Sequence, residues 1–166
     1  MTTVDDQRRQ PARPFRFLMR VPVPWVFILA YLIGVGVEIL FPSHTRSSQV
    51  GLIKVLGGVL FLIGAGVAAW GLLVFRKART TTVPGKSSTA VVMSGPYRFS
   101  RNPMYCGLII AYVGEAGLLV QVWPLIILTL VVAYLNWIVI PVEESRLQAD
   151  FGAEYEQYRA RVHRWI

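Results

Sequence analysis

The sequence predicts an all-α integral membrane protein with four transmembrane helices and a helical C-terminal segment on the cytoplasmic side. Of the 166 residues, 54% are hydrophobic and 16% are charged, and a soluble domain of this length could not bury so much apolar surface. Four apolar stretches each approach the length of about 20 residues that a helical membrane span needs. All but one of the 17 basic residues lie between or outside these stretches, where they set an orientation, and the exception is Lys54.

The first two predicted spans are Val21–Phe41 and Gly51–Phe75, and a basic tail, residues 1–20, precedes them on the cytoplasmic side. Pro22 and Pro24 suit the start of a helix, because proline lacks the N–H group that would have no partner there.

Two pairs of glycines lie inside these spans, Gly34 with Gly36 and Gly64 with Gly66. Neither pair follows a strand, so a nucleotide-binding loop is not indicated. Small residues in membrane helices let two backbones approach closely, and the glycines therefore predict helix packing at these positions.

The third and fourth predicted spans are Met104–Val122 and Trp123–Pro141. Because only a few residues around Val120–Pro124 separate them, they are expected to form a tight antiparallel hairpin. Glu115 makes the third span the weakest of the four. An ionisable residue inside a membrane is a candidate for function, but the span can also end early and leave Glu115 at the far interface.

Positive charge orients the spans. Basic residues concentrate in the N-terminal tail, in residues 76–101 and after residue 142, whereas Arg46 and Lys54 flank the short loop between the first two spans. Since basic loops stay on the cytoplasmic side, both termini and the middle loop are predicted to face the cytoplasm. We expect a plasma or inner membrane location, and the net charge of +8 then favours membrane lipids over nucleic acid as partners.

Two polar regions, Arg76–Pro103 and Val142–Ile166, are the candidates for function. The hairpin between them returns the chain to the side on which it began, so the two regions are predicted to be neighbours. Pro103 is expected to start the third helix, which places Arg101 and Asn102 at an N-terminus where free N–H groups favour an anion. The alternative is an interfacial anchor, with arginines on lipid phosphates and tyrosines in an aromatic belt.

The C-terminal region begins with Glu143 and Glu144, directly after Pro141, which is expected to break or kink the fourth span. Acidic residues in a first helical turn can simply favour the helix dipole, or they can bind a ligand. Gly152 is expected to end this helix before a second amphipathic stretch. The lone Cys106 and two distant histidines give no pattern of metal ligands, so no metal is predicted.

The motif Ser94-Gly95-Pro96-Tyr97-Arg98, followed by Arg101-Asn102-Pro103-Met104-Tyr105, resembles the signature of a membrane methyltransferase family. The later residues that fit the same signature are Glu143-Glu144, Leu147, Phe151-Gly152, Tyr155, Tyr158, Val162 and Arg164. The family is that of isoprenylcysteine carboxyl methyltransferases and phospholipid N-methyltransferases. The resemblance covers residues 79–166. It implies a catalytic core at residues 76–166, and the first two membrane helices, residues 21–75, precede this core.

The resemblance implies an enzyme that uses S-adenosylmethionine (SAM) and methylates a lipid or small hydrophobic acceptor. It implies catalytic roles for Arg101 and Glu144. The residues that it assigns to the cofactor site are Tyr97, Arg98, Arg101, Asn102, Tyr105, Glu143, Glu144 and Tyr155, with Arg164 as a weaker candidate. Many members have histidine where this chain has Asn102, and asparagine cannot relay a proton.

A second hypothesis is a non-enzymatic membrane scaffold whose basic faces bind anionic lipid or a protein partner. Glu143 and Glu144 argue against it, because acidic residues weaken binding to an anionic surface. A transporter or channel would need polar residues along several spans, and Glu115 is almost alone. The sequence indicates no oligomeric state.

Overall fold

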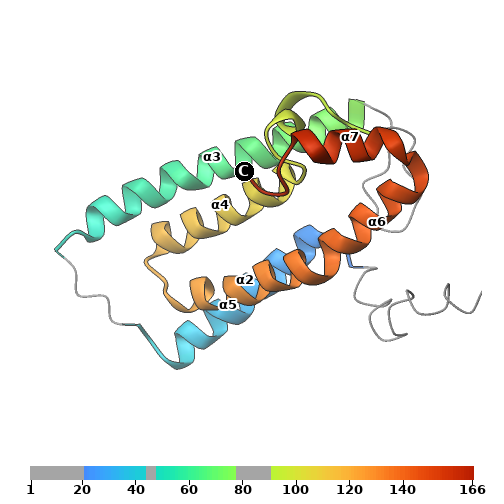
Figure 1. The fold of residues 1–166 in the computed structure, drawn as a ribbon. Helices are drawn as coiled ribbons and strands as arrows, with labels where there is room; N and C mark the ends of the chain where they lie inside the picture. Colours follow the sequence, from blue (N-terminus) through green and yellow to red (C-terminus); the bar gives the residue numbers. More distant parts are fainter. Residues whose placement is uncertain (1–20, 44–47, 78–90) are drawn as a thin grey trace, which may run out of the picture.

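The computed structural model describes residues 21–43, 48–77 and 91–166, and all regular structure in these residues is helical. The chain order is shown in Figure 1. The elements are α2 (Val23–Leu40), α3 (Val50–Lys77), η2 (Gly95–Arg98), α4 (Pro103–Leu119), α5 (Trp123–Tyr134), η3 (Leu135–Val139), α6 (Ile140–Phe151) and α7 (Ala153–Arg161).

Three helical segments are long and apolar enough to cross a membrane, namely α2, α3 and the continuous stretch Trp123–Phe151. The helix in the third predicted span, α4, has 17 residues. At 1.5 Å per residue it measures about 25 Å, against a hydrocarbon thickness of about 30 Å. The all-helical class is confirmed, whereas a crossing by α4 and the cytoplasmic side of the C-terminal segment stay predictions.

The helices pack as two antiparallel pairs, α3 with α4 and α2 with α5 (Figure 1). The short connection predicted between the third and fourth spans is confirmed, since only residues 120–122 separate α4 from α5. Val120 turns the chain with a φ of 55°, a conformation that a β-branched residue rarely adopts. The two helices of this hairpin nevertheless make their most extensive contacts with α3 and α2 rather than with each other.

A seam of glycines brings α3 and α4 into backbone contact. Gly57 and Gly64 face Gly114 and Gly107, at spacings of seven residues on both helices. A Cβ atom on Gly64 would lie 2.6 Å from the Gly107 carbonyl oxygen, and one on Gly107 would lie 2.7 Å from the Gly64 carbonyl oxygen. No side chain fits at such distances, so the close approach of the two helices requires glycine there.

The predicted packing role of the glycine pairs is half right. It is confirmed for Gly64 and for Gly34, where a Cβ atom would lie 2.6 Å from the Pro124 Cα atom. It is wrong for Gly36 and Gly66, whose Cβ atoms would have no neighbour within 4 Å. Residues two apart lie on different faces of a helix, so one member of each pair points away from the partner helix.

Glu38, near the end of α2, binds backbone groups at the start of α5. Its Oε2 atom accepts hydrogen bonds from the backbone N–H groups of Val122 (3.2 Å) and Trp123 (3.3 Å), and its Oε1 atom accepts one from the Ser43 N–H group (2.6 Å). The first N–H groups of a helix have no partner within the helix, so this carboxylate acts as a remote N-terminal cap.

We expect Glu38→Ala to destabilise the protein by about 1–2 kcal/mol, because three backbone N–H groups lose their acceptor. Thermal unfolding in detergent measures the change. Glu38→Gln keeps an acceptor oxygen and is the matched control, with a smaller expected loss. Equal stability of the alanine variant and the wild type would contradict the capping role.

The sequence predicted a break or a kink at Pro141, and of these the break is wrong, because the helix continues from Trp123 to Phe151. Proline normally clashes with the carbonyl group four residues earlier. Here the preceding turn, η3, is π-helical, and the Ile140 N–H group donates to the Leu135 carbonyl oxygen five residues back. The wider turn accommodates the proline ring and places Pro141 in the first turn of α6.

The polar regions meet at one end of the molecule. The start of α2, the end of α3, the start of α4 and the helices α6 and α7 all lie at this end (Figure 1). As predicted, Gly152 separates α6 from α7, and it does so with a positive φ of 50°. The predicted proximity of the two polar regions is therefore confirmed for their described parts, while residues 78–90 of the first region lie outside the described residues.

Candidate functional site

A carboxylate between two guanidinium groups forms the centre of the site. Arg101 at the start of α4 places Nη1 2.8 Å from the Oε1 atom of Glu144 on α6, and the Arg164 Nη2 atom lies 2.7 Å from Oε2. The side chains of Arg101 and Glu144 are each only 11% exposed. Because two cations share one anion, the cluster keeps one net positive charge, which suits an anionic ligand.

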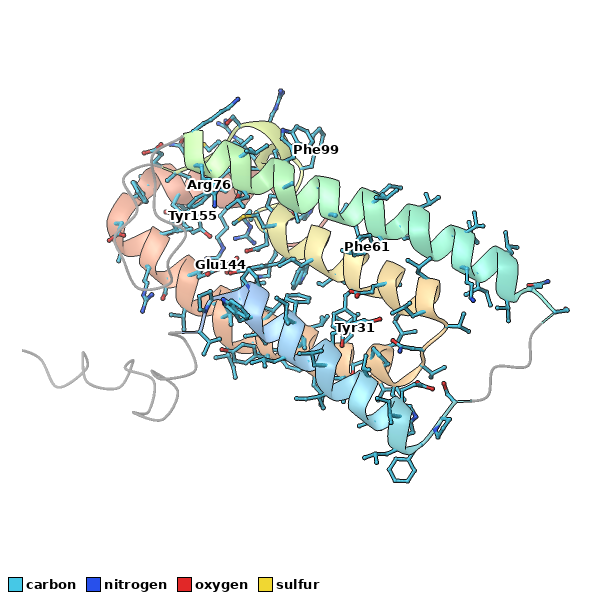
Figure 2. The ribbon with its side chains drawn as sticks, turned by 180° about the vertical axis from the view of Figure 1, so that it is seen from behind. Tyr31, Phe61, Arg76, Phe99, Glu144 and Tyr155 are labelled. Carbon is cyan, nitrogen blue, oxygen red and sulfur yellow. The ribbon has the colours of Figure 1, made fainter. Side chains whose placement is uncertain are left out.

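Tyr155 on α7 closes one side of this cluster, and Figure 2 shows it beside Glu144. Its hydroxyl oxygen accepts a hydrogen bond of 3.5 Å from Arg101 Nη1. Burial raises the pKa of Tyr155, so the phenol stays neutral. Hydrogen bonds from Arg164 to Glu144 raise the pKa of the Arg164 guanidinium, which remains charged.

The C-terminal residues fix the position of Arg101 and Asn102. The Arg101 N–H group donates to the His163 carbonyl oxygen (2.9 Å), and the Asn102 Nδ2 atom donates to the Arg164 carbonyl oxygen (2.9 Å). Ser100, which is buried, accepts a hydrogen bond from the Asn102 N–H group at its Oγ atom (3.1 Å). Asn102 thus joins two segments of the chain rather than presenting a titratable group.

A second polar pair lies between α4 and α6. The Tyr105 hydroxyl group donates a hydrogen bond of 2.8 Å to the Glu143 Oε1 atom. The adjacent carboxylates of Glu143 and Glu144 therefore have different partners, a phenol for the first and two guanidinium groups for the second.

Tyr97 and Arg98 on η2 have opposite environments. Tyr97 is buried, its ring packs against Phe75 at 6.0 Å between centroids, and its carbonyl oxygen accepts a hydrogen bond from the Tyr158 hydroxyl group (2.8 Å). Burial raises the pKa of Tyr97. Arg98 is exposed, as is its neighbour Phe99 at 71%, which lies at the outer edge of the molecule in Figure 2. Among the described residues, no hydrogen bond or ion pair joins Arg98 to the cluster of Arg101, Glu144 and Arg164.

Three contributors were missed by the sequence analysis. Ser100 and Tyr158 form hydrogen bonds with backbone groups of residues 97–102. Tyr158 fits the family signature but was assigned no role in the site, and nothing in its sequence context distinguishes Ser100. Asn136 accepts a hydrogen bond from the Trp165 Nε1 atom (3.1 Å). Its position inside an apolar span was a usable signal, because polar residues there are rare and costly.

The arrangement suits a ligand that carries a carboxylate. Three buried polar side-chain atoms have no hydrogen-bond partner within the described residues: the Arg101 Nε atom and the Tyr97 hydroxyl oxygen at this end of the molecule, and the Tyr112 hydroxyl oxygen in the hydrophobic core. A buried N–H donor without an acceptor is costly, so Arg101 is suited to an additional anionic partner. Within residues 21–43, 48–77 and 91–166, no group of three or more acidic, histidine or cysteine side chains could hold a metal ion.

Comparisons with known proteins agree on one family. The family model described as phospholipid methyltransferase matches residues 52–154. Two curated rice proteins, from Oryza sativa subsp. indica and subsp. japonica, are each named "Probable protein-S-isoprenylcysteine O-methyltransferase". Each is 37% identical over 73 residues, which are 44% of this chain but only 38% of the rice protein. No solved structure gives a significant match.

Proposed function

The chain belongs to the phospholipid methyltransferase family, and from this premise we propose that it transfers a methyl group from SAM to a lipid or membrane-partitioned acceptor. The observation that carries the proposal is the shielded cluster of Arg101, Glu144 and Arg164 with its unpaired Arg101 Nε atom. Both Arg101 and Glu144 lie within the matched segment.

Arg101 and Glu144 have complementary roles in this proposal. Arg101 binds the cofactor carboxylate through the guanidinium atoms that Glu144 does not use. Glu144 accepts hydrogen bonds from a ribose hydroxyl or from the adenine amino group. SAM supplies a methyl group on a sulfonium, which is already a good leaving group. The chain therefore has mainly to align donor and acceptor, and alignment alone can supply several kcal/mol.

The acceptor decides whether a base is needed. The rice relatives' name points to a carboxylate acceptor of the isoprenylcysteine type, and the family name points to a phospholipid amine. An ionised carboxylate needs no base, whereas a protonated amine must first lose a proton. Glu143, held by the Tyr105 hydroxyl group, is the carboxylate that we assign to this step. Glu115 on α4 is left without a role in the reaction.

We place the site on the cytoplasmic face, with both termini on that side and four crossings, α4 being the short one. The even number of crossings and the basic residues near the site support this orientation. Backbone contact with α3 gives α4 a protein neighbour along its length and so supports a crossing by this shorter helix.

Calorimetric titration with S-adenosylhomocysteine (SAH), the product left after methyl transfer, tests the proposal on detergent-purified protein. We expect saturable binding by the wild type and a loss of about 100-fold in affinity for Glu144→Gln, because the amide removes the charged acceptor for the ribose or adenine and the anion that positions both guanidinium groups. Glu154→Gln, an exposed change on α7, is the matched control.

Two results would contradict the proposal. Equal affinity of Glu144→Gln and the wild type would show that the site is wrongly assigned. Absence of SAH binding by folded wild-type protein, repeated in lipid nanodiscs, would favour the membrane scaffold, which predicts salt-sensitive binding to anionic vesicles instead.

A further inference from the structure

We propose that Arg164 is a positioning residue that fixes the Glu144 carboxylate for the cofactor, and that residues 163–165 hold Arg164 in place. The inference rests on the proposed function and extends it to a segment that lies outside the family match, which ends at residue 154.

The geometry of the ion pair distinguishes Arg164 from Arg101. Arg164 contacts both oxygens of Glu144, with Nε 3.2 Å from Oε1 and Nη2 2.7 Å from Oε2. Arg101 forms its ion pair with the Oε1 atom alone. A planar guanidinium that grips both oxygens fixes the rotation of a carboxylate, which a single contact cannot do. Glu144 would also keep this partner when Arg101 turns towards an anionic ligand.

The backbone around Arg164 is attached to the start of α4. The Arg164 carbonyl oxygen accepts hydrogen bonds from Asn102 Nδ2 (2.9 Å) and Ser100 Oγ (3.4 Å), and the His163 carbonyl oxygen accepts one from the Arg101 N–H group (2.9 Å). Residues 163–165 lie beyond the end of α7 and form no regular helix, so these contacts take the place of a helical ladder.

Trp165 attaches the same segment to the helix that carries Glu144. Its indole Nε1 atom donates to Asn136 Oδ1 (3.1 Å), in the π-helical turn upstream of Glu144. The Trp165 ring also packs against the hydrophobic core. Arg164 is thus held between two attachments, one at residues 100–102 directly before α4 and one on η3.

The chain contains its own reporter for this attachment. Cys106 is the single cysteine of the sequence, and its side chain is buried under the C-terminal segment. Its Sγ atom lies 3.8 Å from the Trp165 carbonyl oxygen and 3.6 Å from Ser100 Oγ. Displacement of residues 163–165 would expose the thiol, so its alkylation rate reports on the segment in the absence of any cofactor.

The test compares Arg164→Ala, Arg164→Lys and Trp165→Phe in the full chain, with Arg161→Ala as the exposed control in the preceding helix. Two readouts are taken, the rate of N-ethylmaleimide alkylation at Cys106 and the affinity for SAH. For Arg164→Ala we expect alkylation to rise about tenfold and SAH affinity to fall about tenfold, because Glu144 keeps one of its two partners. Arg164→Lys keeps the charge but lacks the planar guanidinium. Its alkylation rate and SAH affinity are expected to lie between those of Arg164→Ala and the wild type.

Trp165→Phe removes only the indole donor and separates positioning from packing. Because Arg164 keeps its guanidinium but is held less firmly, we expect faster alkylation and a fall in SAH affinity of about twofold to threefold, smaller than that of Arg164→Ala. If Trp165→Phe lowers SAH affinity as much as Arg164→Ala at the same thiol exposure, the guanidinium contributes nothing beyond packing and the proposal is overturned. Unchanged SAH affinity in Arg164→Ala, with a wild type that binds SAH, overturns it as well. A wild type that binds no SAH contradicts the proposed function itself.

Discussion

Arg101→Ala is expected to weaken SAH binding by roughly 100- to 4,000-fold while the protein remains folded. Removing one partner of a buried charged contact costs about 3–5 kcal/mol, and each 1.4 kcal/mol is a factor of about ten in affinity. The affected contact here is the one with the ligand, because Glu144 keeps both hydrogen bonds from Arg164. The variant also converts a cluster of net charge +1 into a neutral pair, which no longer attracts a carboxylate.

Calorimetric titration with SAH measures the effect. Two further variants test whether the charge, the planar guanidinium or the position of the arginine is responsible. Arg101→Lys keeps the charge but loses the fork, so its affinity is expected to be intermediate. Arg98→Ala changes an exposed arginine three residues away and is expected to leave affinity within about twofold. If Arg98→Ala weakens binding as much as Arg101→Ala does, the resemblance assigned Arg98 correctly and the exposed conformation is not the binding one.

The neighbourhood of Arg101 and Glu144 could be predicted from the sequence, but its internal geometry could not. Charge distribution and the hairpin were enough to bring the two polar regions to one end. The bidentate grip of Arg164 and the bond between Trp165 and Asn136 depend on the path of the chain after α7. That path is fixed by hydrogen bonds between groups that meet only in the folded protein, so no periodicity in the sequence predicts it.

Helix positions could likewise be predicted from the sequence, whereas helix ends and irregular turns could not. Hydropathy located four apolar stretches, because burial in lipid or protein acts on composition. The early end of α4 depends on Val120, whose left-handed φ no propensity rule would assign to valine. The continuous helix through Pro141 depends on a π-helical turn that compensates a residue normally disruptive in helices. The early end of α4 is thus the alternative that Glu115 left open, whereas the expected break at Pro141 is wrong because a less common backbone carries the helix through.

Gly64→Leu is expected to destabilise the protein by at least about 3 kcal/mol, the upper range for overpacking in a core. The clash involves the Cβ atom and the Gly107 carbonyl oxygen at 2.6 Å, so no choice of rotamer relieves it. The helices α3 and α4 would have to move apart, and η2, which packs against α3, would lose its support. We therefore expect a lower melting temperature in detergent, by about 2–4 °C per kcal/mol, together with loss of SAH binding.

Gly66→Leu is the matched control, because the same substitution two residues away meets no atom within 4 Å. Leucine is a better helix former than glycine by about 0.8 kcal/mol, so this variant is expected to melt at the same or a higher temperature. The two substitutions change helix propensity and hydrophobicity equally. A melting temperature that falls for Gly64→Leu but not for Gly66→Leu therefore reports on the glycine seam alone. Equal destabilisation of both variants would contradict the seam. A low melting temperature confined to Gly64→Leu would show that α4 depends on backbone contact with α3, the contact that supports a crossing by this short helix.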